Sequence, residues 1–159
     1  DAASAPRVDR YVTNSAFVRD RVRRFYGRDA GVVHPPCIDA KDLRRPGQKR
    51  EDFFLVVSAL VPYKRIDLAV DTFAKSGRKL IIVGDGPEYS GLVKRKSGSI
   101  EFAGKVPYAE IQSLYSRAAG LIFPGVEDFG IVPVEAQAQG CPVIAYARGG
   151  ATETVQPMV

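Results

Sequence analysis

Short apolar runs alternate with amphipathic stretches from residue 53 onward. The runs are rich in β-branched residues, as expected for strands buried on both faces of a sheet, and lie at residues 53–58, 79–83, 100–103, 120–123 and 142–146. Helical stretches separate them at residues 65–75, 87–96, 108–118 and 131–139, and a last helix is expected near Ala151. This succession predicts an α/β fold with a parallel sheet, helices on both of its faces, and a ligand site at the carboxyl ends of the strands.

A separate strand–helix–strand pattern precedes this alternation. Residues 1–8 have the composition of a tail, and residues 9–13 are expected to form a strand. Asn14 and Ser15 offer a cap for a helix over residues 16–26, which Gly27 would end. Residues 31–34 predict another strand, followed by two prolines and a polar, basic connection over residues 39–50.

The positive charge of the chain is concentrated in its first third. Residues 1–50 hold 12 Lys and Arg against 6 Asp and Glu, a balance of +6, whereas residues 51–159 hold 11 against 12, a balance of −1. The helix at residues 16–26 is basic and amphipathic. It could contact anionic lipid, but we favour a solvated basic face with the apolar side packed in the core. The aromatic residues of this region do not form a stacking platform, so we expect no nucleic-acid binding.

Composition limits the class of protein further. The sequence is 45% hydrophobic, enough for a packed core, yet it has no apolar run near the roughly 20 residues that span a bilayer. It also lacks a basic-then-apolar signal pattern, and we expect a cytoplasmic location. Cys37 and Cys141 lie far apart and the chain has one histidine, His34. This predicts buried free thiols rather than a disulfide or zinc site, and a structural histidine.

The candidate functional residues lie around the helix that is expected to begin at residue 131. Gly130 opens that helix, whose first N–H groups and positive dipole end suit an anion such as phosphate. Glu127 lies in the preceding loop and Glu135 on the helix, while Asp128 could cap the helix. Carboxylates repel phosphate but accept hydrogen bonds from sugar hydroxyls. The combination therefore indicates a nucleotide sugar, whereas the plainer interpretation is a pair of surface acids.

The surrounding residues resemble a known family. Glu127 and Glu135 are separated by seven residues, with F-G-I between them and E-A-Q-A-Q-G-C-P-V-I-A beginning at the second. This pattern resembles the E-x7-E signature of retaining GT-B glycosyltransferases of the glycosyltransferase family 4 type. V-S-A-L-V-P-Y-K-R at residues 57–65, G-D-G-P at 84–87 and the glycine pair at 149–150 fall where that family has its other donor-side motifs. Residues 61–70 and 127–138 most resemble bacterial mannosyltransferases of polysaccharide assembly.

The resemblance implies the C-terminal half of a GT-B fold, with a Rossmann-like sheet. Residues 1–40 would be the remnant of an N-terminal acceptor domain with its hinge. Residues 41–159 would be the nucleotide-sugar-binding domain, truncated at its C-terminus. The implied activity is transfer of a sugar, mannose from GDP-mannose by preference, to a polysaccharide or lipid-linked acceptor, and the isolated fragment would bind nucleotide without transferring.

The resemblance also implies the partners of the chain. These are a nucleotide sugar and the missing acceptor domain, with peripheral contact at the inner face of the membrane left open. No cofactor or metal is expected, since GT-B enzymes are metal-independent and the sequence has no D-x-D motif.

The family's roles carry over to three charged residues. Lys64 would neutralise the leaving diphosphate together with the N–H groups around the helix start, and Glu127 would contact the donor sugar near the reacting centre. Glu135 would accept hydrogen bonds from the ribose, and no protein nucleophile is assigned. The N–H groups belong to Phe129, Gly130 and Ile131. Without the glutamates, Lys64 would be interpreted as an ordinary lysine at a helix start.

The remaining implied contacts are made by backbone. Gly84 and Gly86 would let the chain turn tightly under the ligand, and the backbone of Lys105 and Val106 would contact the base. The glycine pair at residues 149 and 150, Gly149 and Gly150, would approach the sugar-phosphate. Glycines of this kind also occur in plain turns and loops, so the signal from each is weak.

One position departs from the family pattern. The family has arginine beside the lysine on the diphosphate, where this chain has Ala59. Either Arg65 or another basic group replaces it, or diphosphate binding is weakened. Ala59 is thus the one sign of an alternative function, a nucleotide-sugar-binding module without transferase activity. A nicotinamide-dependent enzyme is disfavoured, because S-A-L-V-P-Y-K follows the first strand where the glycine fingerprint would stand.

Overall fold

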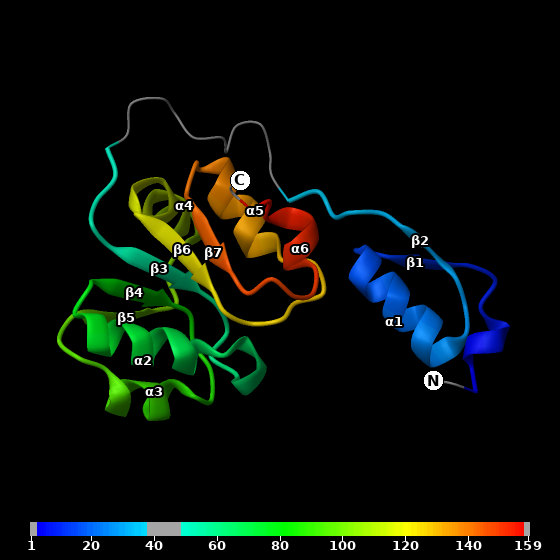
Figure 1. The fold of residues 1–159 in the computed structure, drawn as a ribbon, viewed down its shortest axis with the longest axis horizontal. Coiled ribbons are helices and arrows are strands. Elements are labelled where there is room, and N and C mark those ends of the chain that lie inside the picture. The colour runs from blue at the N-terminus through cyan, green and yellow to red at the C-terminus, as the bar shows by residue number, and fades with distance from the viewer. Residues whose placement is uncertain (1–2, 38–48, 158–159) are drawn as a thin grey trace.

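Residues 3–37 and 49–157 are described by the computed structural model, which contains a five-stranded parallel sheet in the order β5-β4-β3-β6-β7 (Figure 1). Every neighbouring pair in it is parallel. The strands are β3 (Phe54–Val57), β4 (Leu80–Val83), β5 (Ile100–Gly104), β6 (Gly120–Phe123) and β7 (Val143–Ala145). Each overlaps one predicted run, so the predicted α/β fold with a parallel sheet is confirmed.

Helices cover both faces of the sheet because side chains alternate along its strands. Leu80 and Ile82 of β4 pack in the core under α2 (Ile66–Ser76) and α3 (Tyr89–Arg95). Ile81 and Val83 point the other way, into the core beneath α4 (Tyr108–Arg117) and α5 (Ile131–Ala138). The last described element is the short α6 (Ala151–Thr154). All five helices lie where the sequence predicts them.

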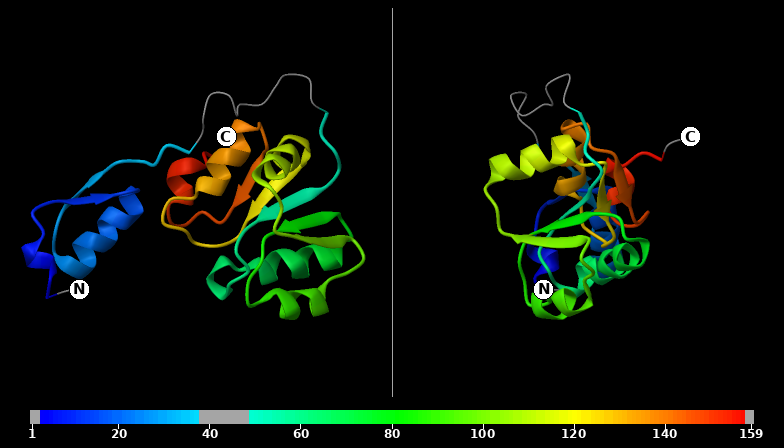
Figure 2. Two further views of the ribbon diagram at one scale, coloured as in Figure 1. Left: turned by 180° about the vertical axis from the view of Figure 1, so that it is seen from behind. Right: turned by 90° about the vertical axis from the view of Figure 1, so that its left-hand side faces the viewer.

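The first described residues form a small unit beside the sheet domain (Figure 2). It contains the parallel pair β1 (Tyr11–Thr13) and β2 (Ala30–Val32), joined by α1 (Ala16–Tyr26). The side chain of Ser15 caps α1 and Gly27 ends it with a φ of 61°, as predicted. The tail predicted for residues 1–8 is wrong in part, because η1 (Ala5–Arg7) is a 3-10 helix whose Ala5 is buried.

Some predictions of burial are wrong at the edges of the fold. Ile144 of β7 is 57% exposed, and Glu101 of β5 is also exposed, because each of these strands has a neighbour on one side only. Cys141 is a buried free thiol as predicted, whereas Cys37 is only partly buried. On α1, Val22 is buried but Phe25 remains exposed, so the predicted apolar side packs only in part.

Two sequence predictions concern features that the structure addresses only in part. Most of the basic connection predicted at residues 39–50 lies outside the described residues. Within the described ranges, no helix is both long and apolar enough to cross a bilayer.

Candidate functional site

The order of the strands places one candidate site at a particular edge of the sheet. The chain first extends the sheet from β3 through β4 to β5, and then returns to the other side of β3 with β6 and β7. In parallel sheets, ligands bind at the carboxyl ends of the two strands where the order reverses. Here these are β3 and β6, and Lys64 follows β3 while Glu127 follows β6.

Lys64 and Glu127 meet at this edge. Lys64 ends η3 (Pro62–Lys64), a 3-10 helix that the sequence did not predict, and its Nζ contacts Oε1 of Glu127. The two side chains are only 16% and 22% exposed. Gly125 permits the approach, since a Cβ there would lie 2.9 Å from the Cα of Lys64. Glu127 is therefore a partly buried, paired acid rather than a freely solvated one.

The ammonium group of Lys64 lies in a partly dehydrated setting. Burial lowers the pKa of Lys64, and the negative charge of Asp128 acts in the opposite direction. The ring of Tyr63 lies beneath the charge, with 5.2 Å between Nζ and the ring centroid. A cation held in this way interacts more strongly with an added anion than a solvated lysine does.

The start of α5 lies next to this pair. Gly130 precedes the helix with a φ of 92°, a conformation that favours glycine, and no side chain in the described part of the chain caps the helix. The suggestion that Asp128 caps α5 is wrong, because its carboxylate instead pairs with Arg21 of α1 at 2.7 Å. Phe129 is buried and its ring packs against that of His34. The first N–H groups of α5 thus have the uncapped geometry that an anion site requires.

Glu135 is held by two tyrosines that the sequence analysis missed. The hydroxyl of Tyr108 donates to its Oε1 at 3.1 Å, and the hydroxyl of Tyr115 donates to its Oε2 at 3.4 Å. Burial raises the pKa of Glu135, and the two hydrogen bonds act in the opposite direction. Tyr115 is fully buried on α4, and burial together with the charge of Glu135 raises the pKa of its hydroxyl.

Only a weak signal in the sequence could have revealed these tyrosines. They are seven residues apart, which places both on one side of a helix, but the same spacing also fits ordinary core positions.

The glycine pair after β7 supports the loop that carries Glu127. Gly150 N donates to the carbonyl of Glu127 at 2.8 Å, and Gly149 forms a parallel bridge with the same residue. A Cβ on Gly149 would overlap that carbonyl, and one on Gly150 would overlap the carbonyl of Asp128. The pair is therefore required for close contact between two loops and is not a plain loop. Its approach to a sugar-phosphate stays a prediction.

Gly84 and Gly86 play a similar part on the other side of β3. A Cβ on Gly84 would overlap the carbonyl of Ser58, and one on Gly86 would overlap that of Leu60. Leu60 N also donates to the carbonyl of Asp85 at 2.9 Å. The loops after β3 and β4 thus pack backbone against backbone, which requires glycine irrespective of any ligand.

Three predicted positions have side chains engaged outside the Lys64–Glu127 pair. Arg65 has a φ of 54° and its guanidinium binds both carboxylate oxygens of Asp67, at 3.1 and 3.3 Å. Lys105 is 82% exposed with its Nζ 3.8 Å from Asp85, and Val106 packs against the core beneath α4. Arg65 is thus paired with an acid of α2, and its contact with a diphosphate stays a prediction, as does contact of the 105–106 backbone with a base.

His34 pairs with a carboxylate that the local sequence could not reveal. Its Nε2 lies 3.2 Å from Oε2 of Glu153, which is 119 residues away in the chain. The interpretation of His34 as structural agrees with this contact. Among the described residues, no three His, Cys, Asp or Glu side chains gather as they would around a metal ion.

Several proteins of known sequence or structure are similar to this chain. The chain is 28% identical over 157 residues to the O-antigen chain mannosyltransferase RfbU of Salmonella typhimurium, covering 89% of this chain and 43% of that protein. It is 31% identical over 168 residues to the D-inositol 3-phosphate glycosyltransferase of Mycobacterium tuberculosis, covering 89% of this chain and 35% of that protein. The chain therefore spans less than half the length of these curated relatives.

The fold has close structural neighbours among GT-B glycosyltransferases. The crystal structure of Anabaena Alr3699/HepE in complex with UDP and glucose matches with a TM-score of 0.82 at 20% identity, over 99% of this chain and 52% of that one. Residues 39–159, well over half of the sequence, match the sequence profile of the family described as glycosyl transferases group 1, and the chain therefore belongs to that family.

Proposed function

We propose that the chain is the donor-binding part of a retaining glycosyltransferase of the E-x7-E type. The contact between Lys64 and Glu127, at the point where the strand order reverses, carries this proposal. The uncapped start of α5 lies beside it, so a cation, N–H donors and a carboxylate converge on one location. A nucleotide sugar needs each of them, since its diphosphate is anionic and its sugar offers hydroxyl donors.

Each group then has a role in transfer. As the bond to the anomeric carbon breaks, negative charge grows on the leaving diphosphate, where Lys64 and the N–H groups of Phe129, Gly130 and Ile131 stabilise it. Loss of one such donor typically costs about 3 kcal/mol of transition-state stabilisation. Glu127 accepts hydrogen bonds from the sugar near the reacting carbon and Glu135 from the ribose. The leaving phosphate assists the incoming hydroxyl on the same face, and no protein nucleophile is needed.

For the donor and acceptor, we propose mannose from GDP-mannose and a polysaccharide or lipid-linked acceptor at the cytoplasmic face of the membrane. Similarity to a relative named as an O-antigen chain mannosyltransferase supports this choice. The competing donor is a UDP-sugar, since the neighbouring HepE structure contains UDP and glucose. We further propose that the 159-residue chain binds donor without transferring the sugar, because it spans less than half the length of its curated relatives, and that no metal is required.

One observation favours the alternative, a binding module without transferase activity. Ala59 is exposed where the family has arginine, and the candidate replacement named from the sequence, Arg65, is paired with Asp67. The diphosphate would then be held by one cation fewer than in the family.

Calorimetric titration without added metal tests the proposal. We expect the chain to bind GDP and GDP-mannose more tightly than UDP and UDP-glucose, and Lys64→Ala to weaken GDP binding at least tenfold. Lys94→Ala is the matched control, because this lysine is exposed on α3, away from the Lys64–Glu127 pair. Absence of binding by every nucleotide at millimolar concentration would refute the proposed function, and preference for UDP compounds would refute the proposed donor.

A further inference from the structure

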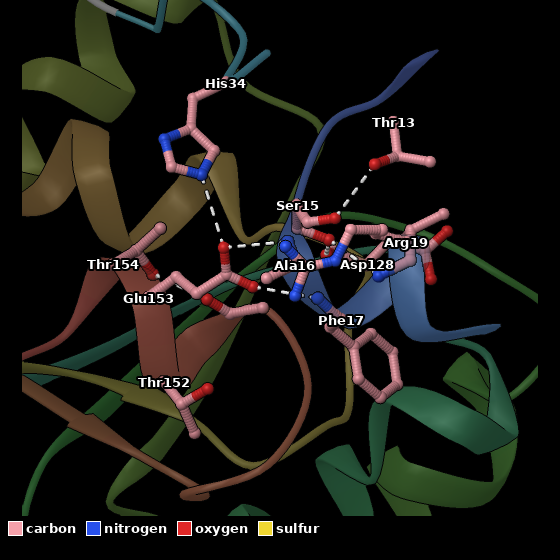
Figure 3. Close-up of polar contacts among 12 residues, drawn as sticks. Thr13, Ser15, Ala16, Phe17, Arg19, His34, Asp128, Thr152, Glu153 and Thr154 are labelled. Carbon is pink, nitrogen blue, oxygen red and sulfur yellow. Dashed lines mark hydrogen bonds and ion pairs between the residues drawn. The ribbon is translucent and has the colours of Figure 1, made fainter. Parts of the chain in front are cut away.

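A polar junction joins the start of α1 to the sheet domain (Figure 3). The carboxylate of Glu153 accepts from the backbone N–H of Ala16 at 2.9 Å and from that of Phe17 at 3.0 Å. The hydroxyl of Ser15 donates to the carbonyl of Asp128 and accepts from Val18 N, the latter at 3.1 Å. We call the contacts of Ser15, Ala16 and Phe17 with Asp128 and Glu153 the α1 junction.

The junction satisfies the start of a helix with groups from a remote part of the chain. The first N–H groups of any helix lack partners within it, and they form the positive end of its dipole. In α1, Ser15 satisfies one of them and Glu153, 136 residues beyond Phe17, satisfies two more. The side chain of Glu153 is only 20% exposed, and its hydrogen bonds are charge-assisted. Both hydrogen bonds are exposed, so their strength rests on the charge of the acceptor rather than on burial.

The same unit also holds the loop that carries Glu127. Besides Ser15, Arg21 of α1 pairs with the carboxylate of Asp128 at 2.7 Å, and the ring of His34 packs 5.3 Å from that of Phe129. The two residues that follow Glu127 are thus both in contact with the N-terminal unit.

A second route connects Glu153 to the same loop through backbone. Glu153 N donates to the carbonyl of Gly150 at 2.9 Å, and Gly150 N donates to the carbonyl of Glu127 at 2.8 Å. Glu153, which caps α1, is therefore hydrogen-bonded directly to Gly150, which supports Glu127. Movement of α1 away from Glu153 would remove the contacts of Ser15 and Arg21 with Asp128, and this backbone route alone would then hold the loop.

We propose that Glu153 is a positioning residue, which clamps the N-terminal strand–helix–strand unit onto residues 127–129 and so holds Glu127 opposite Lys64. The clamp itself is independent of any ligand. Its consequence for donor binding rests on the proposed function, in which Glu127 contacts the sugar and Lys64 the diphosphate.

Amide hydrogen exchange of the 159-residue chain, followed by NMR, tests the clamp without nucleotide. We expect Glu153→Ala to speed exchange at Ala16 and Phe17 at least tenfold and to speed exchange across residues 127–130, while β4 amides are unchanged. Glu153→Gln keeps one acceptor oxygen and should speed exchange at the same residues to a smaller extent. This variant replaces Glu153→Ala in the test if the alanine variant unfolds. Glu101→Gln on the exposed side of β5 is the control and should leave every site unchanged.

Two exchange results would overturn the proposal. Unchanged exchange at Ala16 and Phe17 would mean that Glu153 does not cap α1 in solution. Faster exchange at these two residues with no change across residues 127–130 would mean that the contact is local and does not position the loop.

Nucleotide titration then separates positioning from general destabilisation. Because Glu127 contacts the sugar, while residues 129 and 130 also offer N–H groups to the diphosphate, Glu153→Ala should lower GDP-mannose affinity at least threefold more than it lowers GDP affinity. An equal loss for both nucleotides would refute a positioning role. Failure of the unaltered chain to bind any nucleotide would overturn the proposed function instead, and the exchange experiment would still decide on the clamp.

Discussion

Removal of the Tyr115 hydroxyl tests how Glu135 is held. Tyr115→Phe leaves the buried ring in place and deletes only the donor to Oε2 of Glu135. A hydrogen bond to a charged group contributes about 1.5–3 kcal/mol. Because the distance of 3.4 Å is long for such a bond, we expect the free energy of unfolding to fall by a value near the lower limit, about 1.5 kcal/mol.

The free energy of unfolding that Tyr115→Phe loses should increase with pH. The pKa of Glu135 is already raised by burial, so the folded state binds a proton more readily than the unfolded chain, and stability falls as pH rises past the unfolded pKa. Loss of a donor to the carboxylate raises this pKa further. The destabilisation by Tyr115→Phe should therefore be larger near neutral pH, where more of Glu135 is ionised, and smaller near pH 4, where less of it is.

Urea unfolding of the unaltered chain and of Tyr115→Phe, at neutral pH and at pH 4, measures this loss of stability. Tyr89→Phe is the matched control, because Tyr89 lies on α3 with its ring against Phe102 and is remote from Glu135. If Tyr115→Phe and Tyr89→Phe lost the same free energy of unfolding, or if the loss in Tyr115→Phe were equal at the two pH values, the view that the Tyr115 hydroxyl holds the Glu135 carboxylate would be refuted. In the proposed function, Tyr115→Phe should also reduce the preference for GDP over 2′-deoxy-GDP.

Three further changes follow from other contacts. Gly150→Ala should lower the free energy of unfolding by about 1–3 kcal/mol in thermal unfolding, because the added Cβ overlaps the carbonyl of Asp128. Gly98→Ala is the control, since Gly98 has open space around it and the change should not lower stability. Similar melting temperatures of the two variants would count against the close loop contact. Arg50→Ala should cost about 1–3 kcal/mol in urea unfolding because the guanidinium donates to carbonyls at the ends of both α4 and α5, and an unchanged midpoint would contradict this. Ala59→Arg should tighten GDP binding several-fold in calorimetry, and unchanged affinity would mean that this position does not weaken diphosphate binding.

The elements that sequence reasoning placed well are those fixed by neighbours in the chain. The bounds of α1 follow from Ser15 and Gly27, a side-chain cap and a left-handed end that act within one turn. Burial of a strand depends instead on its place in the sheet. The run in β4 lies inside the sheet and is buried throughout, while the similar run in β7 lies at the edge and exposes Ile144. The sequence pattern is alike in both cases.

In the candidate site, too, local features could be predicted from the sequence and contacts between distant segments could not. The spacing of Glu127 and Glu135 is local and could be recognised, but what holds each carboxylate could not. Lys64 lies 63 residues before Glu127, and Tyr115 approaches Glu135 only because α4 and α5 pack on the same face of the sheet. For a similar reason, capping of α1 by Glu153 could not be predicted, since the two segments lie more than 130 residues apart.

The two glutamates are held by different chemistry, and this matters for how each could meet a ligand. Glu127 is held by a cation, whereas Glu135 is held by two neutral hydroxyls. A diphosphate bound as proposed competes with Glu127 for the charge of Lys64, so donor binding itself would free that carboxylate to turn toward the sugar. The tyrosines do not take part in this competition. Each donates one hydrogen bond, and a carboxylate oxygen can accept two, so Glu135 keeps acceptor capacity for a ribose while its position stays fixed.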